Sequence, residues 1–232
     1  SGFGFGFGFS PLGALLNQYP AVLDDGNTVG WYDYTKSDTI TKDGSNFVSA
    51  WNSRIGSNHL EQPIGTNQPL HTANGVKFDG IDNFMSTANF TLNQPVNVYM
   101  VVKQVTWTAN GNIFSGKSDN GATSIRNNLV TPNIIILSPN NGAENTGLTL
   151  NVFHFLQALF NTSSSKLRID NNVATTGNIG TKNAGGINVA KMGVSNLYFA
   201  DIELKELIVR KIADTSGNET IIYNYLKTKH GL

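Results

Sequence analysis

The sequence predicts an all-β protein, an antiparallel two-sheet sandwich with a short C-terminal helix and an extended N-terminal arm. Short β-rich runs alternate with polar turns through most of the 232 residues, as they do in sandwich domains. Val96–Val105 is apolar almost throughout, which predicts a central strand buried on both faces. Near the C-terminus, Glu219–Lys229 has apolar residues at helical spacing and is followed by Gly231, a natural helix stop.

The chain opens with a segment in which glycine and phenylalanine alternate. In an extended backbone, alternate side chains share a face, so one face of this segment carries Phe3, Phe5, Phe7 and Phe9. The segment is either a flexible low-complexity tail or an assembly arm that docks on a neighbouring subunit by strand addition. We assign residues 1–20 to this arm and residues 21–232 to one β-sandwich domain.

In the first half of the sandwich, clusters of apolar residues between turn signals mark the expected strands. These clusters are the aromatic group Trp31–Tyr34, then Phe47–Trp51, Val76–Phe78, a run that starts at Phe84, Val96–Val105, and Ile113–Phe114. Trp31 and Trp51 lie in such clusters, so we expect both rings in the core.

In the second half, six further runs continue the pattern: Asn133–Leu137, Leu148–Leu150, Val152–Phe160, Lys166–Ile169, Ile187–Met192 and Leu197–Ile212. The periodicity of Val152–Phe160 fits a strand or a helix, and the turn signals on both sides favour a strand that pairs with Lys166–Ile169. Within Leu197–Ile212, the apolar positions change parity between Leu204 and Leu207. This change predicts a β-bulge, or a fully buried ribbon, around Glu206.

Composition excludes several classes of function. The chain has 16 basic and 16 acidic residues and no basic run, so nucleic acid is not expected as a main partner. It has no cysteine, which excludes thiol catalysis and cysteine-based metal sites. No stretch approaches the roughly 20 apolar residues of a membrane span. The first residues show no basic region followed by an apolar core, so no secretory signal is predicted.

The order of residues in Trp51–Phe84 carries a family resemblance. It holds a tryptophan, a polar turn, two Gln-Pro pairs, Asn-Gly, and an apolar–polar ribbon that ends at Phe78-Asp79-Gly80. This order resembles concanavalin A-like (laminin-G-like) jelly-roll domains, particularly those on bacteriophage structural proteins and secreted bacterial proteins. Ile202–Val209 resembles the family's late strand, and Tyr223–Leu226 is similar to the helix that closes many phage-borne members. The resemblance implies a jelly-roll sandwich that serves as a lectin, a glycosidase or an adhesive module.

Glycosidases of this fold, the laminarinase type, use two carboxylates that project from one strand into one cleft, about 5–5.5 Å apart in retaining enzymes. The best candidates here are Asp201, Glu203 and Glu206, but their order does not match the Glu-x-Asp pattern of the enzymes. We expect Asp201 and Glu203 to be exposed beside Lys205, and Glu206 to be hydrogen-bonded near the bulge. The sequence therefore predicts a protein that is not an enzyme and has no catalytic residues.

No metal or other cofactor is predicted. None of the four histidines has metal-ligand spacing to another, and His154 lies in an apolar strand, as a satisfied half-buried residue would. Asp79, Asp82 and Asn83 offer the oxygen ligands that calcium prefers. Asp79-Gly80 is also a simple turn signal, in which Asp79 would cap the turn.

Sugar binding needs an exposed aromatic ring beside amide or carboxylate groups, because a sugar has an apolar face and a rim of hydroxyls. Trp107 has such neighbours, and the predicted carbohydrate-binding residues are Trp107, Asn110, Asn112, Asp119 and Asn120. The alternative is that Trp107 covers the end of the sandwich core.

Taken with the resemblance, these features predict a non-enzymatic structural or adhesion protein on the surface of a phage virion: a capsid decoration, head fibre or tail component. The arm would join it to other virion proteins or to copies of itself, and the sandwich would bind cell-surface glycans. The alternatives are a carbohydrate-binding module of a secreted or surface bacterial protein, and a glycoside hydrolase.

Overall fold

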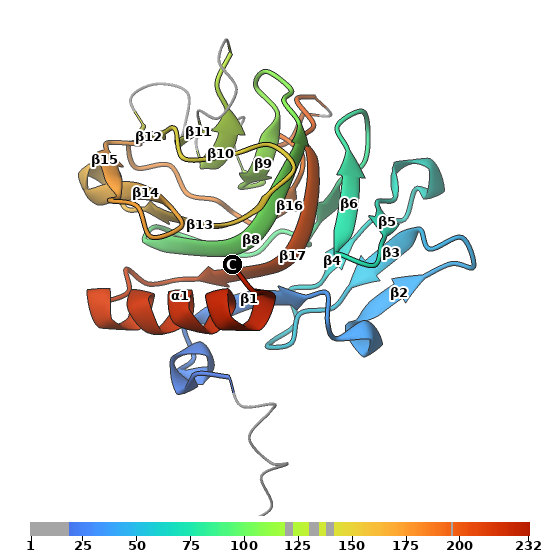
Figure 1. The fold of residues 1–232 in the computed structure, drawn as a ribbon, viewed down its shortest axis with the longest axis horizontal. Helices are drawn as coiled ribbons and strands as arrows, with labels where there is room; N and C mark the ends of the chain where they lie inside the picture. The colour runs from blue at the N-terminus through green and yellow to red at the C-terminus, as the bar shows by residue number, and fades with distance from the viewer. Residues whose placement is uncertain (1–18, 119–122, 130–134, 138–141, 196) are drawn as a thin grey trace, which may run out of the picture.

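The computed structural model of the chain describes residues 19–118, 123–129, 135–137, 142–195 and 197–232 (Figure 1). It confirms the predicted sandwich: two antiparallel sheets stack on each other, and one α-helix, α1 (Ser216–His230), closes the described chain. Phe3, Phe5, Phe7 and Phe9 of the predicted arm lie outside the described residues.

The first sheet, sheet A, is 8-stranded in the order β15-β14-β13-β8-β17-β6-β5, and β1 also pairs with β17. Its strands are β1 (Thr28–Asp33), β5 (Leu70–His71), β6 (Val76–Asp79), β8 (Val96–Thr106), β13 (Phe153–Phe160), β14 (Ser165–Ile169), β15 (Thr175–Gly177) and β17 (Asp201–Arg210).

The second sheet, sheet B, is 9-stranded in the order β12-β11-β10-β9-β16-β7-β4-β3-β2. Its strands are β2 (Ile40–Lys42), β3 (Val48–Trp51), β4 (Leu60–Glu61), β7 (Met85–Ser86), β9 (Asn112–Ser115), β10 (Ser124–Asn127), β11 (Ile135–Leu137), β12 (Glu144–Asn145) and β16 (Asn188–Val189). In the connections of the described residues, four short 3-10 helices occur: η2 (Ala21–Asp24), η3 (Ser37–Thr39), η4 (Gly65–Asn67) and η5 (Thr162–Ser164).

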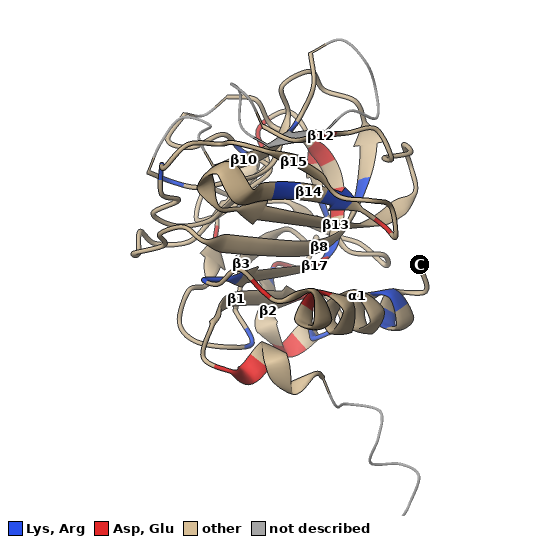
Figure 2. Cartoon of the chain, turned by 90° about the vertical axis from the view of Figure 1, so that its left-hand side faces the viewer, with Lys and Arg blue, Asp and Glu red and all other residues tan. Residues whose placement is uncertain are grey.

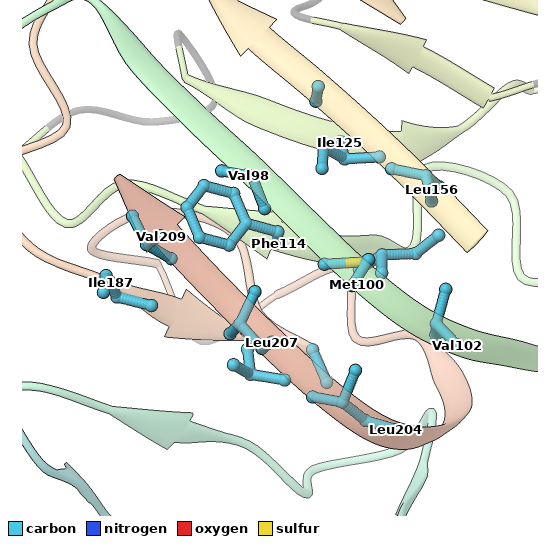
Figure 3. Packing of buried hydrophobic residues seen from close by; sticks show 14 of the residues in the cluster. Val98, Met100, Val102, Phe114, Ile125, Leu156, Ile187, Leu204, Leu207 and Val209 are labelled. Atoms are coloured by element: carbon cyan, nitrogen blue, oxygen red, sulfur yellow. The ribbon is translucent and has the colours of Figure 1, made fainter. Parts of the chain in front are cut away.

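Strand β8 is central, as its apolar run predicts, because it pairs with both β13 and β17. Val98, Met100 and Val102 point into the core between the two sheets, where Figure 3 shows them packed among residues from several strands. Tyr99 and Val101 point the other way, into a second cluster beneath α1. Burial on both faces explains why the run shows no alternation between polar and apolar residues.

Strand β17 contains the predicted bulge. Its register with β8 shifts between Leu204 and Glu206, so Leu204 and Leu207 both point into the core. The bulge also divides the other edge of β17, because β6 pairs before it and β1 pairs after it. Glu203 lies before this bulge and Glu206 lies at it.

Helix α1 lies against the outer face of sheet A, opposite sheet B (Figure 1). Its first turn is capped by Thr215, whose Oγ1 accepts a hydrogen bond from the backbone N–H of Asn218 at 3.3 Å. Its end is capped by Gly231 in the left-handed conformation, with φ 67°, as the sequence predicts. Ile222 and Leu226 are fully buried between the helix and the sheet.

The prediction that Val152–Phe160 forms a strand is confirmed by β13, which pairs with β14 as expected. The prediction of a strand at Leu148–Leu150 is wrong, and the local strand is β12. The side chain of Asn145 accepts a hydrogen bond from the backbone N–H of Gly147 at 3.0 Å, which turns the chain out of the sheet. The run Ile187–Met192 is a strand only over β16, because Ala190 takes a positive φ of 61°.

Two further features concern membrane spans and the distribution of charge. Within the described ranges, no helix is long and apolar enough to cross a membrane. Figure 2 shows basic and acidic residues interspersed over the strands and α1 in that view, in keeping with a formal net charge of zero.

Candidate functional site

The side chain of Glu203 is buried and paired, so the prediction that it is exposed is wrong. It forms an ion pair with Lys103 and accepts a hydrogen bond from the hydroxyl of Thr72. Burial alone would raise the pKa of Glu203, but the bonds from Lys103 and Thr72 hold that pKa below its usual range. An ionised, paired carboxylate of this kind is not the general acid that a glycosidase needs.

Glu206 is hydrogen-bonded, as expected, and it is also completely covered by α1. Its carboxylate accepts bonds from Trp31 Nε1 at 2.7 Å and from Lys229 Nζ at 2.7 Å, and it lies 2.6 Å from His230 Nε2. Substrate cannot reach a carboxylate that has no exposed surface and is enclosed by these three partners. Glu203 and Glu206 therefore do not form an open catalytic pair. Asp201, which the sequence also predicted to be exposed, is half-buried and lies 4.0 Å from Lys77 Nζ.

The Asp79 loop is a capped turn. Asp79 Oδ1 accepts hydrogen bonds from the backbone N–H groups of Ile81, Asp82 and Asn83, at 2.9, 3.2 and 3.2 Å. This is the second of the two interpretations that the sequence left open, and it uses the oxygen that a cation would need. The described residues include no cluster of three or more His, Cys, Asp or Glu side chains that could hold a metal ion.

His154 is buried, and its side chain is satisfied, as predicted. Its Nδ1 lies 2.6 Å from Asp170 Oδ2, and its Nε2 accepts a hydrogen bond from the backbone N–H of Thr149 at 3.0 Å. Both ring nitrogens are occupied within the fold, so the imidazole is not free for chemistry.

One end of the sandwich, which we call the loop end, gathers three segments: 107–112 between β8 and the start of β9, 126–129 at the end of β10, and 197–199 before β17. Three hydrogen bonds hold the segments together. Trp107 Nε1 donates to the carbonyl of Asn128 at 3.2 Å, Asn127 Nδ2 donates to that of Thr108 at 3.0 Å, and the N–H of Asn112 donates to that of Tyr198 at 2.8 Å. Residues distant in the sequence thus form one continuous surface.

Two aromatic side chains lie at the loop end. Trp107 is half-buried and packs against the sandwich core, so it covers the core, as the alternative proposed, and still has an accessible edge. Tyr198 is 43% exposed and has a φ of 57°, a left-handed conformation that is unusual for an aromatic residue. Such strain costs about 1–3 kcal/mol and is often found at functional sites.

The sequence did not single out Tyr198, because nothing in its local pattern reveals a positive φ. Two large apolar side chains of the same segments, Leu129 and Leu197, are 60% and 56% exposed. The loop end therefore carries exposed apolar side chains as well as two aromatic rings.

The predicted grouping around Trp107 needs correction at Asn112. Its side chain is fully buried, and Nδ2 donates to the carbonyl of Asn110 at 2.8 Å, so it shapes the loop and is not available to a ligand. Asn110 itself is half-buried in the turn, with a φ of 63°.

Asp119 and Asn120 lie outside the described residues. The β9–β10 register pairs Ser115 with Ser124 next to the hairpin turn, and Asn112 with Arg126 at the far end. The turn between Ser115 and Ser124 therefore starts from the end of the hairpin opposite Trp107. In agreement, Lys117 and Ser118 bond to the backbone of Ala184, away from the loop end.

Comparisons with known proteins identify the fold alone. No family model and no curated protein matches the sequence. Among solved structures, the chain is similar to Trypanosoma rangeli sialidase at 10% identity and a TM-score of 0.62, covering 88% of this chain and 33% of the sialidase. The chain shares a β-sandwich fold with such proteins. It spans about a third of the sialidase chain.

Two further structures are similar. One is a structure of botulinum neurotoxin type C, whose cell entry is dependent upon interaction with two ganglioside molecules. It has 11% identity and a TM-score of 0.50, with 89% of this chain and 52% of that chain covered. The other is domain 4 of the GH43 extracellular arabinanase AbnA from Geobacillus stearothermophilus, in complex with arabinotriose, with 13% identity, a TM-score of 0.48, and coverage of 86% and 98%.

Proposed function

We propose that the protein is a non-enzymatic adhesion domain that binds glycans at the loop end. The observation that carries this proposal is the pair of accessible rings, Trp107 and Tyr198, at the end of the sandwich that also carries the half-buried amides of Asn110 and Asn128. An aromatic ring packs against the apolar face of a sugar, while neighbouring amides hydrogen-bond to its hydroxyls. The fold suits this role, because similar sandwiches occur in a sialidase solved with sialic acid and in a toxin that interacts with gangliosides.

Glu203 and Glu206 both form buried ion pairs, which favours a protein that binds glycans without hydrolysing them. Glu203 is paired within sheet A and Glu206 with α1, and neither belongs to the loop end. A glycoside hydrolase remains the less favoured alternative, and recovery of intact glycans after incubation with the protein tests it.

Replacing Tyr198 with asparagine is expected to weaken glycan binding by about tenfold or more, because hot-spot aromatic residues contribute at least this much. Asparagine tolerates a positive φ, so the loop should keep its course. Trp107→Ala is expected to act in the same direction. The measurement is a glycan-array screen of the unaltered protein, followed by calorimetric titration of its best ligand against each variant.

Val173→Asn is the control, since this side chain is 90% exposed and lies in the turn after β14, outside the three segments of the loop end. Unchanged affinity in Tyr198→Asn and Trp107→Ala, with both variants folded, would place binding elsewhere.

The finer part of the proposal is that the domain is displayed on a phage virion, as a capsid decoration, head fibre or tail component. Its support is the resemblance to phage-borne members of the family, together with the alternating Gly-Phe arm. A carbohydrate-binding module of a secreted or surface bacterial protein agrees equally well with the fold.

If the arm is an assembly device, the full chain should form oligomers and a chain that lacks residues 1–10 should be a folded monomer. The physical reason is that four phenylalanines on one face need a partner surface to bury them. Light scattering gives both masses. A variant with serine at positions 3, 5, 7 and 9 keeps the length of the arm and serves as the matched control. Two monomeric samples would show that the arm does not drive self-assembly.

A further inference from the structure

Arg126 is a half-buried cation on β10, within the loop end. Its Nε is buried and has no hydrogen-bond partner in the part of the chain that the structure describes. Among the described residues, no carboxylate forms an ion pair with its guanidinium. By strand register, the nearest acidic residue on the same row is Glu144, which pairs with Ile136 as Ile136 pairs with Arg126. It is two strands away, about 10 Å.

An unpaired guanidinium is unfavourable at this position. Burial lowers the pKa of Arg126, and only the nearby Tyr198 phenol counteracts this effect. Arg210, by contrast, is fully buried and pairs with two carboxylates, those of Asp25 and Asp214. Since proteins normally pair a buried cation, the position of Arg126 indicates a site that is completed by an anion from outside.

The register places Arg126 beside the aromatic surface. It stands opposite Asn112 in the β9–β10 ladder, and the backbone N–H of Asn112 donates to the carbonyl of Tyr198. Two residues further along, the carbonyl of Asn128 accepts the hydrogen bond from Trp107 Nε1. One ligand can therefore lie against the rings and reach the guanidinium.

We propose that the loop end binds glycans that carry an anionic group, a carboxylate or a sulfate, and that Arg126 pairs with this group. The inference rests on the proposed glycan-binding function of the same site. Arginine suits the role, because its planar fork of N–H donors matches the oxygens of both groups.

The test is a glycan array that displays neutral, sialylated, uronic-acid-containing and sulfated glycans, probed with the full chain and with Arg126→Met. We expect the full chain to bind mainly anionic members, and Arg126→Met to lose about 10- to 100-fold in affinity for them. Methionine keeps the apolar part of the side chain and removes the donors. Binding should also weaken as salt is raised.

Two variants serve as controls. Arg168→Met removes another half-buried arginine whose Nε has no partner, but Arg168 lies over the rings of Phe155 and Tyr223 near α1. Glu144→Gln removes the acidic residue in the same row. Neither should reduce binding.

The outcomes separate the inference from the function on which it rests. Binding to neutral glycans that depends on Tyr198 and is unchanged in Arg126→Met would overturn the inference and keep the proposed function. No binding to any member of the array would overturn both. Loss of anionic binding in Arg126→Met supports the inference, and the class of the lost ligands identifies the group as carboxylate or sulfate.

Discussion

Replacing Arg210 with methionine is expected to destabilise the protein by about 3–5 kcal/mol, the usual effect of breaking a buried ion pair. The side chains of Arg210 and Asp214 have no exposed surface, and Nε and Nη2 of the arginine donate to the two carboxylate oxygens at 2.9 Å each. Methionine would leave the charge of Asp214 buried without its counter-ion.

The remaining partners of Arg210 explain why the effect should spread. The guanidinium also bonds to Asp25 and Thr28 and to the backbone carbonyl of Val22, so it joins η2 and the start of β1 to the end of β17. Through this contact and its own turn, the pKa of Asp25 is held at about 2 although burial opposes the shift. Loss of Arg210 should therefore loosen η2 as well as β17.

Urea denaturation followed by tryptophan fluorescence measures the loss, since Trp31 lies in the same layer. Lys211→Met is the matched control, because Lys211 is the next residue, is exposed, and bonds here only through its backbone. Its expected change is within about 0.5 kcal/mol. A similar, small loss in both variants would mean that Asp214 finds another partner.

The main elements of the fold could be predicted because each leaves a local pattern. The double-sided burial of β8 removes polar residues from its sequence, and the bulge in β17 changes the parity of its apolar positions. Helix α1 carries both a glycine stop and apolar residues at helical spacing. Sheet B was harder, because strands such as β7 and β16 contain only two residues and are defined by neighbours far away in the sequence.

The environment of the charged and polar residues was harder to predict from the sequence than the strands and the helix. Glu203 looks like a surface residue in the sequence, yet it is buried beside Lys103 of the neighbouring strand β8. The grouping around Trp107 assumed that nearness in sequence means nearness in space. Instead, the side chain of Asn112 is buried, and its backbone N–H holds Tyr198, a residue from a distant loop, at this end of the sandwich.

Three clusters of buried charge lie along the outer face of sheet A: Glu203 with Lys103, Glu206 with Lys229, and Arg210 with Asp214. They alternate with the apolar residues that α1 covers, such as Ile208. The apolar contacts supply the area that holds the helix, while the ion pairs fix its position along the strand.

The second large effect is expected for Lys229→Met, with a loss of about 3–5 kcal/mol at neutral pH. Lys229 Nζ bonds to Asp33 Oδ2 at 2.6 Å and to Glu206 Oε2 at 2.7 Å, and both carboxylates have no exposed surface. Without the ammonium, Asp33 keeps Arg54 and Glu206 keeps Trp31 and His230, so each carboxylate retains only part of its compensation. Lys227→Met, an exposed lysine one half-turn earlier in α1, should change stability little.

The pH dependence of the loss distinguishes this cause from simple loss of packing. Burial alone would raise the pKa of Asp33, but Lys229 and its other partners hold that pKa below its usual value. The carboxylate therefore stabilises the native protein above about pH 4 and loses this contribution as the pH falls through its folded-state pKa. Burial would lower the pKa of Lys229, yet Glu206 and Asp33 raise it. The contribution of Lys229 to stability is therefore complete below about pH 10.4 and is lost as the pH rises through its folded-state pKa.

The difference in free energy of unfolding between the native protein and Lys229→Met should thus be greatest from about pH 5 to 10 and should narrow on acidification. Urea denaturation at a series of pH values measures this difference. A difference that stays constant down to pH values near 2 would mean that the methylene stem of Lys229, and not its charge, holds α1 on the sheet.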